Sequence, residues 1–286
     1  MMKVVSTIKD IKRRLEDLCL APVGLVPTMG ALHEGHMSLV RNAIYECPVI
    51  VVSIYVNPTQ FNDKKDLENY PRPIEADLVL LKSVLRNSDI VFTPPDSEMY
   101  PSEDKRVFRF GNLGRVMEAV HRPGHFNGVA QVVSKLFDIV GPDIAYFGIK
   151  DFQQVAVIRE LIRQEGYKII IRENPILRES DGLAMSSRNR LLEPDIRRKA
   201  PVIFRSISEA TCMLKDHDIP EIKSHIRESI EKAGDFHVEY FEIVDDKKLV
   251  PVRGKSEMKR NGRYRGCIAV RAGKIRLIDN IEFPLP

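Results

Sequence analysis

Two histidines separated by three positions stand in residues 27–36, which join a predicted strand to a predicted helix. Gly30 and Gly35 allow the backbone to approach a ligand closely, and a helix start offers N–H groups and a positive dipole end to phosphate. His33 and His36 share one face if the turn is helical, and each can donate a hydrogen bond to a phosphate oxygen. Such donors stabilise the charge that builds up when phosphorus is attacked. The pattern also fits a turn with two surface histidines, and no acidic residue or cysteine stands at the spacing of a metal site.

A second candidate phosphate site lies in residues 183–190, where Ser186 and Ser187 precede Arg188. Two hydroxyls beside a guanidinium group can clamp a phosphate. The alternative is a helix cap followed by a surface arginine.

A third segment, residues 147–154, again joins a predicted strand to a predicted helix. Lys150 is placed to contact a phosphate, and Gln154 faces the same site one helical turn later. A glycine turn in which Asp151 caps the helix also explains the segment, and both explanations can hold together.

Two further segments carry side chains that suit a small organic acid. Asn57 and Gln60 directly follow a buried strand, and their neutral amides can bind hydroxyls or a carboxylate. Arg122, in residues 121–129, can neutralise a carboxylate or a phosphate. A proline-containing turn at residues 56–61 and a helix start at His125 are the competing explanations.

The elements that must position these loops alternate along the first half of the chain. Apolar, β-branched runs predict strands at residues 24–27, 49–56, 90–92, 144–147 and 169–171. Amphipathic stretches predict helices through residues 38–43 and over 74–85, 126–140 and 152–164. This alternation predicts a Rossmann-like α/β fold, with right-handed crossovers and a parallel sheet covered by helices on both faces. Ligands bind such sheets beyond the carboxyl ends of the strands, where the unusual loops fall.

The pattern changes after about residue 175, which predicts a smaller C-terminal α+β domain over residues 177–286. Helices are expected over residues 194–214 and 220–233, and strands over 238–244, 267–270 and 275–278. The polar, basic residues 253–265 predict an exposed loop or hairpin. The N-terminal domain is expected to span residues 1–176.

Composition argues against several classes of protein. Lys and Arg number 44 against 40 Asp and Glu, and the excess is spread along the chain, so a nucleic-acid partner is not expected. The basic stretch at residues 255–265 is the one feature that suggests such a partner, and a solvated loop is the commoner explanation for it. Four widely spaced cysteines predict reduced thiols, and no signal peptide or membrane-spanning run is recognised, which predicts a cytoplasmic location without a membrane partner.

The five loop segments, in this order, resemble those of the pantoate–β-alanine ligases (pantothenate synthetases), and the resemblance extends over residues 4–280. The His-x-Gly-His and Met-Ser-Ser-Arg segments also resemble the signatures of the wider nucleotidylyltransferase and class I aminoacyl-tRNA synthetase superfamily. The resemblance implies a reaction of ATP, Mg²⁺ and pantoate that gives pantoyl adenylate, which β-alanine converts to pantothenate and AMP. It also implies a homodimer whose C-terminal domain acts as a lid over the nucleotide. Another nucleotidylyltransferase, which transfers AMP onto a phosphorylated acceptor, is the competing hypothesis.

The resemblance also implies roles for individual residues. His36 would donate a proton, with His33, Lys150, Ser186, Ser187 and Arg188 supporting the phosphates. Gln60 would contact both pantoate and β-alanine, Gln154 would contact pantoate, and Asn57 and Arg122 would assist. The remaining ATP contacts would be Met29, Gly30, Ala31, Leu32, Glu34, Gly35, Gly148, Ile149, Asp151, Leu177 and Met185, and the magnesium ligands are not assigned.

The chain departs from the family pattern at a few positions. Ile149 stands where Glu or Gln is common, Phe152 replaces a common Tyr, and Pro73 replaces a common Asp. Residues 62–66 also differ from the usual Gly-Pro-rich loop. These differences concern loop closure and affinity, and they leave the class of reaction unchanged.

Overall fold

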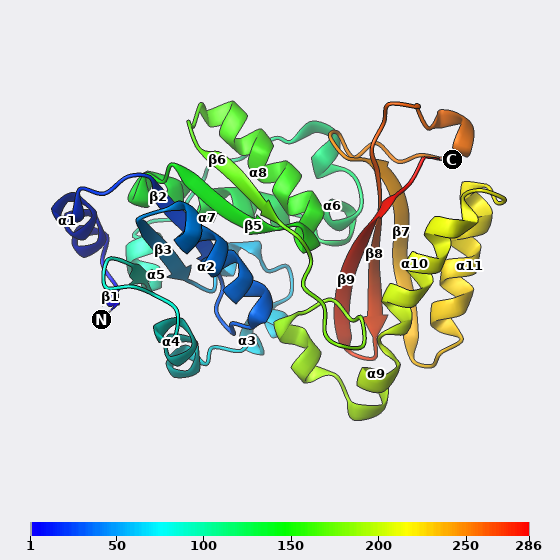
Figure 1. The fold of residues 1–286 in the computed structure, drawn as a ribbon, viewed down its shortest axis with the longest axis horizontal. Coiled ribbons are helices and arrows are strands. Elements are labelled where there is room, and N and C mark those ends of the chain that lie inside the picture. Colours follow the sequence, from blue (N-terminus) through cyan, green and yellow to red (C-terminus); the bar gives the residue numbers. More distant parts are fainter. Residues whose placement is uncertain (1, 286) are drawn as a thin grey trace. The chain divides into compact units, whose positions relative to one another are not determined.

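Six parallel strands form one sheet in the described part of the chain, residues 2–285 of this computed structural model (Figure 1). Their order is β1-β4-β3-β2-β5-β6. The strands are β1 (Lys3–Val5), β2 (Val23–Thr28), β3 (Val49–Ile54), β4 (Ile90–Phe92), β5 (Ile144–Gly148) and β6 (Ile170–Asn174). Every pair is parallel, which confirms the predicted Rossmann-like sheet.

Helices connect these strands. They are α1 (Ile8–Leu18), α2 (Glu34–Glu46), α3 (Lys64–Glu68), α4 (Ile74–Lys82), α5 (Asp96–Met99), α6 (Glu118–His121), α7 (His125–Val140) and α8 (Phe152–Glu165). Short 3-10 turns are η1 (Pro58–Gln60), η2 (Gly111–Gly114) and η3 (Ile149–Asp151). Apolar side chains of α2 and α4 share a core with β2, β3 and β5, while α7 contacts both β2 and α1.

Strand β3, in the interior of the sheet, is buried on both faces. Val49, Ile50, Val51 and Val52 are all fully buried, so side chains that point to opposite faces are equally shielded from water. Burial of one such side chain contributes roughly 1.5–3 kcal/mol. The continuous apolar run in the sequence is therefore the signature of a strand with helices on both sides.

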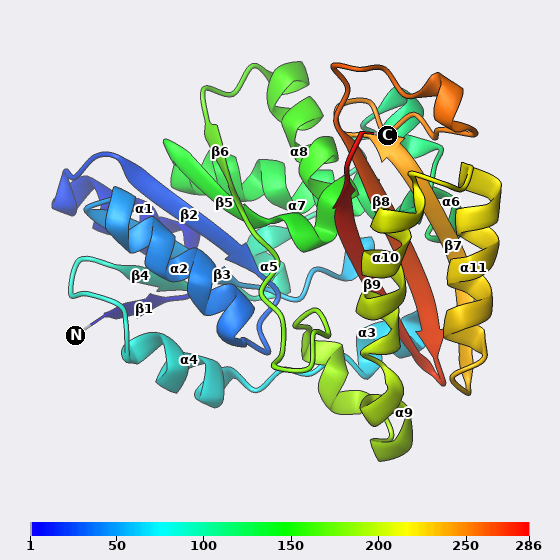
Figure 2. The same cartoon turned by 45° about the vertical axis from the view of Figure 1, so that its right-hand side comes forward.

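A second, antiparallel sheet lies in the C-terminal part, with order β7-β8-β9. Its strands are β7 (Phe236–Asp245), β8 (Tyr264–Ala272) and β9 (Ile275–Phe283), with the helices α9 (Pro194–Lys199), α10 (Val202–Met213) and α11 (Ile219–Glu231). Short turns are η4 (Ser187–Leu191) and η5 (Lys255–Glu257). Figure 2 shows α10 and α11 along one face of this sheet, and contacts place α11 on β7 and α10 on β9.

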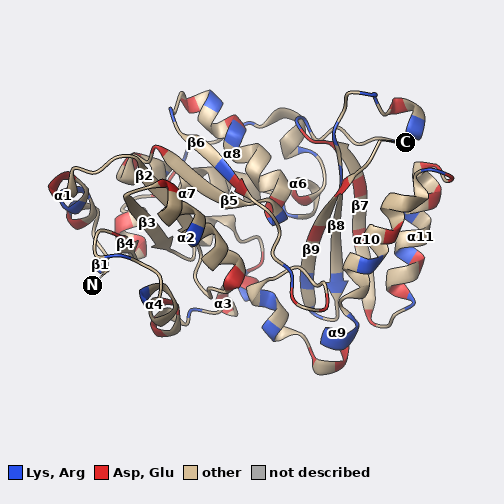
Figure 3. Cartoon of the chain, in the orientation of Figure 1, with Lys and Arg blue, Asp and Glu red and all other residues tan. Residues whose placement is uncertain are grey.

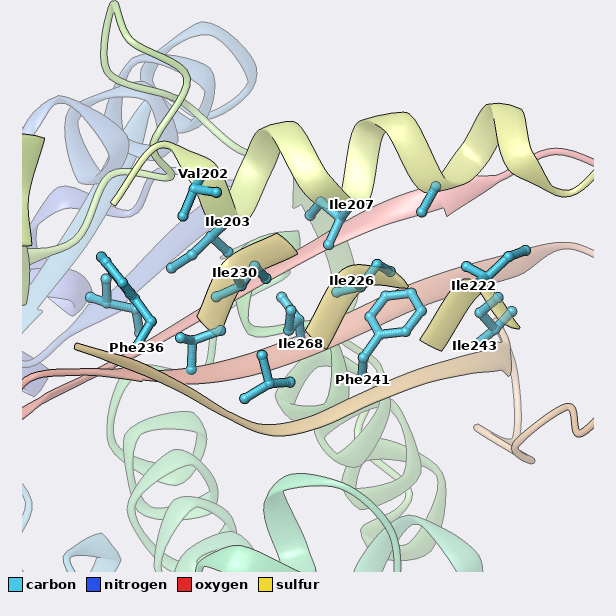
Figure 4. Packing of buried hydrophobic residues seen from close by; sticks show 14 of the residues in the cluster. Val202, Ile203, Ile207, Ile222, Ile226, Ile230, Phe236, Phe241, Ile243 and Ile268 are labelled. Carbon is cyan, nitrogen blue, oxygen red and sulfur yellow. The ribbon is translucent and has the colours of Figure 1, made fainter. Parts of the chain in front are cut away.

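Isoleucines at helical spacing form the core of this part (Figure 4). Ile222, Ile226 and Ile230 recur every four residues along α11, so they lie on one face and pack towards the sheet. Phe241 and Ile268 meet them from β7 and β8. The amphipathic pattern of the sequence thus predicts which face of α11 is buried.

Contacts divide the chain into two compact units. The first contains residues 1–114, 118–149 and 154–175, and the second contains residues 115–117, 150–153 and 176–286. The second unit therefore includes the short segment at Lys150, which lies within the range predicted for the N-terminal domain, residues 1–176.

The structure differs from the sequence prediction at several elements. The prediction of a single helix over residues 194–214 is wrong, because α9 ends at Lys199 and α10 begins at Val202. Pro201 between them has no N–H to continue the helix. Strand β1 and helix α1 were not predicted, and β8 and β9 are longer than expected.

Charged residues of both signs are interspersed along both units (Figure 3). In the basic segment near the C-terminus, Arg263 pairs with Asp246 and Arg265 lies 3.9 Å from Glu282. Acidic partners therefore balance part of this positive charge. Across residues 2–285, every helix is too short or too polar to cross a membrane.

Candidate functional site

The order of strands in the first unit marks one position where a ligand is expected. Strands β3, β4 and β1 lie on one side of β2, and β5 and β6 lie on the other. The direction of winding therefore reverses between β2 and β5, where open α/β sheets bind ligands beyond the strand ends. Residues 29–36 follow β2 at this point, and the segment that begins at Gly148 leaves β5.

The loop after β2 has an unusual backbone that a buried carboxylate holds. Gly30 and Ala31 both have positive φ, 79° and 49°. Asp77 of α4 accepts hydrogen bonds from the N–H of Ala31 (2.8 Å) and the N–H of Leu32 (2.7 Å). A Cβ on Gly30 would lie 3.0 Å from an oxygen of Asp77, so glycine suits this position for space as well as for φ. The sequence analysis did not identify Asp77, because its partners are 45 and 46 positions away.

Substitution of Asp77 by asparagine should disturb this loop. The amide nitrogen would face one of two backbone N–H groups, so one buried donor would lose its acceptor at a cost of about 1–3 kcal/mol. We expect weaker ATP binding and a lower melting temperature, measured by calorimetry and thermal unfolding. Asp17→Asn, at an exposed position of helix α1, serves as the control. ATP affinity equal to that of the unmodified protein would show that the carboxylate does not hold the loop.

Two histidine rings meet at the start of α2. His33 is the N-cap, and its Nδ1 accepts from the N–H of Gly35 (3.1 Å). The Nδ1 of His36 accepts from the N–H of His33 (3.3 Å), and the ring centroids are 4.1 Å apart. Because Nδ1 accepts in both rings, the proton of each neutral imidazole lies on Nε2. Each ring therefore has an Nε2–H donor, beside the positive end of the helix dipole.

The acidic residue of this helix start is balanced by a cation. Glu34 forms an ion pair at 2.9 Å with Arg41, which lies further along α2. This pairing reduces the repulsion that a carboxylate in the first turn would exert on a bound phosphate. The predicted ATP segment from Met29 to His36 therefore keeps a net attraction for anions.

Gln60 joins this loop to the segment after β3. Its side chain is 7% exposed, and its Nε2 lies 2.9 Å from the sulfur of Met29. Gln60 is the predicted contact for pantoate and β-alanine, and Met29 opens the predicted ATP segment. The structure thus places these two predicted residues in contact.

Asn57 supports the side chain of Gln60. It is 1% exposed, and its Nδ2 donates to Gln60 Oε1 (3.2 Å) and to the carbonyl of Gly128 (3.0 Å). Its Oδ1 accepts from the hydroxyls of Tyr100 (2.8 Å) and Thr59 (3.2 Å). Burial raises the pKa of Tyr100, so its hydroxyl keeps the proton that it donates. All hydrogen-bonding positions of the Asn57 amide are occupied, so we expect a positioning role in place of the direct substrate contact suggested by its sequence position.

Helix α7 contacts the backbone of η1, the turn that contains Gln60. His125 Nδ1 lies 2.9 Å from the carbonyl oxygen of Gln60, and Arg122 Nη1 lies 3.2 Å from His125 Nε2. A carbonyl only accepts and a guanidinium only donates, so His125 must carry its proton on Nδ1. Arg122 also lies 3.9 Å from Glu118. His125 is thus more than a helix start, and its 65-residue separation from Gln60 explains why no local pattern signals this contact.

The segment after β5 places its predicted residues at a helix start. Lys150 and Asp151 form part of η3, and Gln154 lies half-buried in the first turn of α8. Ile149 also lies in η3. Because its side chain is apolar, a hydrogen bond to the nucleotide at that position would use its backbone.

In the second unit, the serine-rich segment begins with a cap. Ser186 is the N-cap of η4, and its hydroxyl accepts from the N–H of Arg188 at 3.2 Å. Ser187 and Arg188 are both half-buried in the same turn. The helix-cap explanation is therefore correct for Ser186, and it leaves the phosphate-clamp hypothesis for Ser187 and Arg188 in place.

Metal ligands are sparse in the described residues. No group of three or more His, Cys, Asp or Glu side chains there could hold a metal ion. Magnesium commonly binds through phosphate oxygens, waters and one or two carboxylates. A dedicated protein cage is therefore not part of this candidate site.

Comparisons with known proteins agree with this arrangement. The model of the family described as pantoate-beta-alanine ligase matches residues 3–282. The pantothenate synthetase of Bacteroides thetaiotaomicron is 49% identical over 284 residues, covering 99% of each chain. A crystal structure of pantothenate synthetase from Thermus thermophilus has a TM-score of 0.89 at 38% identity, covering 99% of this chain and 100% of that one. The pantoate-beta-alanine ligase of Francisella tularensis, complexed with beta-gamma ATP and beta-alanine, has a TM-score of 0.80 at 32% identity, covering 99% and 98%.

Proposed function

Because this chain belongs to the pantoate–β-alanine ligase family, we propose that it uses ATP to condense pantoate with β-alanine, giving pantothenate, AMP and pyrophosphate. The observation that carries this function is the contact between Met29 and Gln60. It joins a loop built to donate hydrogen bonds to phosphate with an amide suited to a small polar acid. Adenylation of a carboxylate needs these two binding functions side by side.

The first step activates the carboxylate. A carboxylate oxygen of pantoate attacks the α-phosphorus of ATP, the bond from that phosphorus to the bridging oxygen breaks, and pyrophosphate leaves. The Nε2–H groups of His33 and His36 donate hydrogen bonds to phosphate oxygens as their charge increases, and His36 shares its Nε2 proton with the leaving pyrophosphate through such a bond. Lys150, Ser186, Ser187 and Arg188 support the same charge.

The second step forms the amide. The amine of β-alanine attacks the acyl carbon of pantoyl adenylate, and the bond between that carbon and the AMP oxygen breaks. A mixed anhydride with AMP is a far better electrophile than a free carboxylate, because AMP is a good leaving group. Gln60 contacts both acids and Gln154 contacts pantoate, which aligns the amine with the acyl carbon.

The remaining assignments follow the family resemblance. Residues 1–176 bind ATP and pantoate, and residues 177–286 provide the lid. Further ATP contacts come from the backbone of Gly148 and Ile149, from Asp151, and from Leu177 and Met185. Arg122 contributes positive charge, while its contacts with His125 and Glu118 hold it in place.

Magnesium, the oligomer and the cellular location belong to the same proposal. Mg²⁺ accompanies ATP and is held chiefly by phosphate oxygens and water. The active form is a homodimer, for which sedimentation should give twice the chain mass of 32.7 kDa. The reaction takes place in the cytoplasm, where ATP is supplied.

The function is tested by product analysis. The purified protein is incubated with ATP and Mg²⁺ together with pantoate, with β-alanine, with both, or with a phosphorylated acceptor in place of both, and products are identified by mass spectrometry. Pantothenate and AMP should accumulate together, and only when all three substrates are present. AMP transfer onto a phosphorylated acceptor, without any need for pantoate, would instead indicate another nucleotidylyltransferase.

A further inference from the structure

The second unit contains a small hairpin that ends at two predicted ATP contacts. The N–H of Met185 donates to the carbonyl of Leu177 (3.0 Å), and the N–H of Glu179 donates to the carbonyl of Leu183 (2.8 Å). Residues 177–179 therefore pair with residues 183–185 in an antiparallel arrangement, with an isolated bridge between Arg178 and Ala184. This backbone pairing fixes Leu177 and Met185 relative to each other.

A buried carboxylate of β9 anchors the hairpin. Asp279 is 4% exposed and accepts two hydrogen bonds from Arg178, at 2.7 and 3.0 Å. The same guanidinium donates to the carbonyl of Gly182 (3.2 Å) and lies 3.6 Å from the ring centre of Phe204. A bidentate pair of this kind fixes orientation as well as distance.

The next residue of β9 holds the segment at Lys150. Asn280 is 1% exposed, and its Nδ2 donates to the carbonyl of Lys150 at 2.9 Å. Its Oδ1 accepts from Arg265 Nη1 at 2.8 Å, and Arg265 in turn lies over the ring of Phe152, 4.7 Å from its centre. The amide orientation of Asn280 is therefore set, because Arg265 can only donate.

Adjacent side chains of a strand point to opposite faces. In β9, Asp279 therefore holds the hairpin through Arg178, and its neighbour Asn280 holds the segment at Lys150. We propose that Asp279 and Asn280 are positioning residues, which hold the Leu177–Met185 hairpin and the Lys150 segment in one fixed register for ATP. The inference depends on the proposed function, because it takes both segments as parts of the ATP site. Neither side chain needs to touch the nucleotide.

The test uses Asn280→Asp, which replaces the side-chain amide with a carboxylate of almost the same volume. The carboxylate still accepts from Arg265, but it cannot donate to Lys150 and repels that carbonyl. We expect affinity for the ATP analogue α,β-methylene-ATP with Mg²⁺, measured by calorimetry, to fall about tenfold, as for one lost hydrogen bond. The KM for ATP should rise by a similar factor, while the KM for β-alanine stays within about twofold.

Two further variants separate positioning from general stability. Asp279→Asn removes the charge opposite Arg178, and it should also weaken nucleotide binding selectively. Glu239→Gln is the matched control, because Glu239 of β7 forms ion pairs with Arg271 of β8 and Arg276 of β9 in the same sheet. It should lower the melting temperature without a selective effect on ATP.

The outcomes are distinct. Unchanged analogue affinity in Asn280→Asp overturns the inference, as does an equal loss for every substrate that tracks the loss of stability in Glu239→Gln. If the unmodified protein binds the analogue but makes no pantothenate, the proposed function fails while the binding comparison still tests the positioning. If it binds no nucleotide, both fail.

Discussion

Replacing His36 by alanine should lower the rate of pantoyl-adenylate formation by about 100- to 1,000-fold, the usual effect of removing one donor to a developing charge. The Nδ1 of His36 accepts from the N–H of His33, so its Nε2–H is directed by that bond. The substitution removes the donor and half of the capping box at the start of α2. The lost cap costs about 1 kcal/mol, which is small beside the roughly 5–15 kcal/mol of a folded domain. The variant should therefore fold normally but form pantoyl adenylate slowly.

Pantoate-dependent exchange of labelled pyrophosphate into ATP measures this step without β-alanine. His225→Ala, on α11 of the second unit, is the matched control and should exchange at the normal rate. Thermal unfolding of both variants checks that the fold is retained. Exchange by His36→Ala within a few-fold of the unmodified protein would remove His36 from the chemical step.

Replacing Gly128 by alanine should impair the use of both acids by about 100-fold, because a displacement near 1 Å at the reacting groups can have that effect. An alanine Cβ would lie 2.4 Å from the carbonyl oxygen of Thr59 and 2.6 Å from the N of Gln60. Both are backbone atoms, so no side-chain rotation relieves the contact, and η1 must move away from α7. Helix propensity alone favours alanine over glycine by about 1 kcal/mol. Overpacking of about 1–3 kcal/mol opposes and exceeds this gain.

The expected pattern for Gly128→Ala is specific. The kcat/KM for pantoate and for β-alanine should fall together, while binding of α,β-methylene-ATP changes little. Gly114→Ala is the matched control, since the nearest atom to its new Cβ would be 4.0 Å away. Normal kcat/KM values for both acids in Gly128→Ala would show that the η1–α7 contact does not set the position of Gln60.

Local signals predicted most of the first sheet. The β-branched run at β3 and the amphipathic stretch of α7 are visible in the sequence, because buried strands and one-sided helices impose their own periodicities. Strand β1 has three residues, of which Lys3 and Val4 are exposed, so it lacks the wholly buried apolar run that marks the equally short β4. Helix α1 carries Ile8, Ile11, Leu15 and Leu18 at helical spacing, so a local signal for this helix is present in the sequence and was missed.

Local signals also indicated the loops that we expect to carry chemistry, but they did not show which residues hold those loops in place. Asp77 lies 45 and 46 positions from its partners in the glycine loop, and Asn280 lies 130 positions from Lys150. Such contacts arise from tertiary structure, and no spacing in the sequence encodes them. For the same reason the sequence does not show how Asn57 is held, because its partners Tyr100 and Gly128 lie far along the chain.

The adenylate route is the central claim, and the destination of one oxygen tests it most directly. Pantoate labelled with ¹⁸O in its carboxylate is converted in the presence of ATP, Mg²⁺ and β-alanine, and the phosphorus-containing products are analysed by mass spectrometry. Attack on the α-phosphorus leaves one labelled oxygen in AMP and none in pyrophosphate. Label in inorganic phosphate, with ADP as the nucleotide product, would mean attack on the γ-phosphorus and would contradict the account.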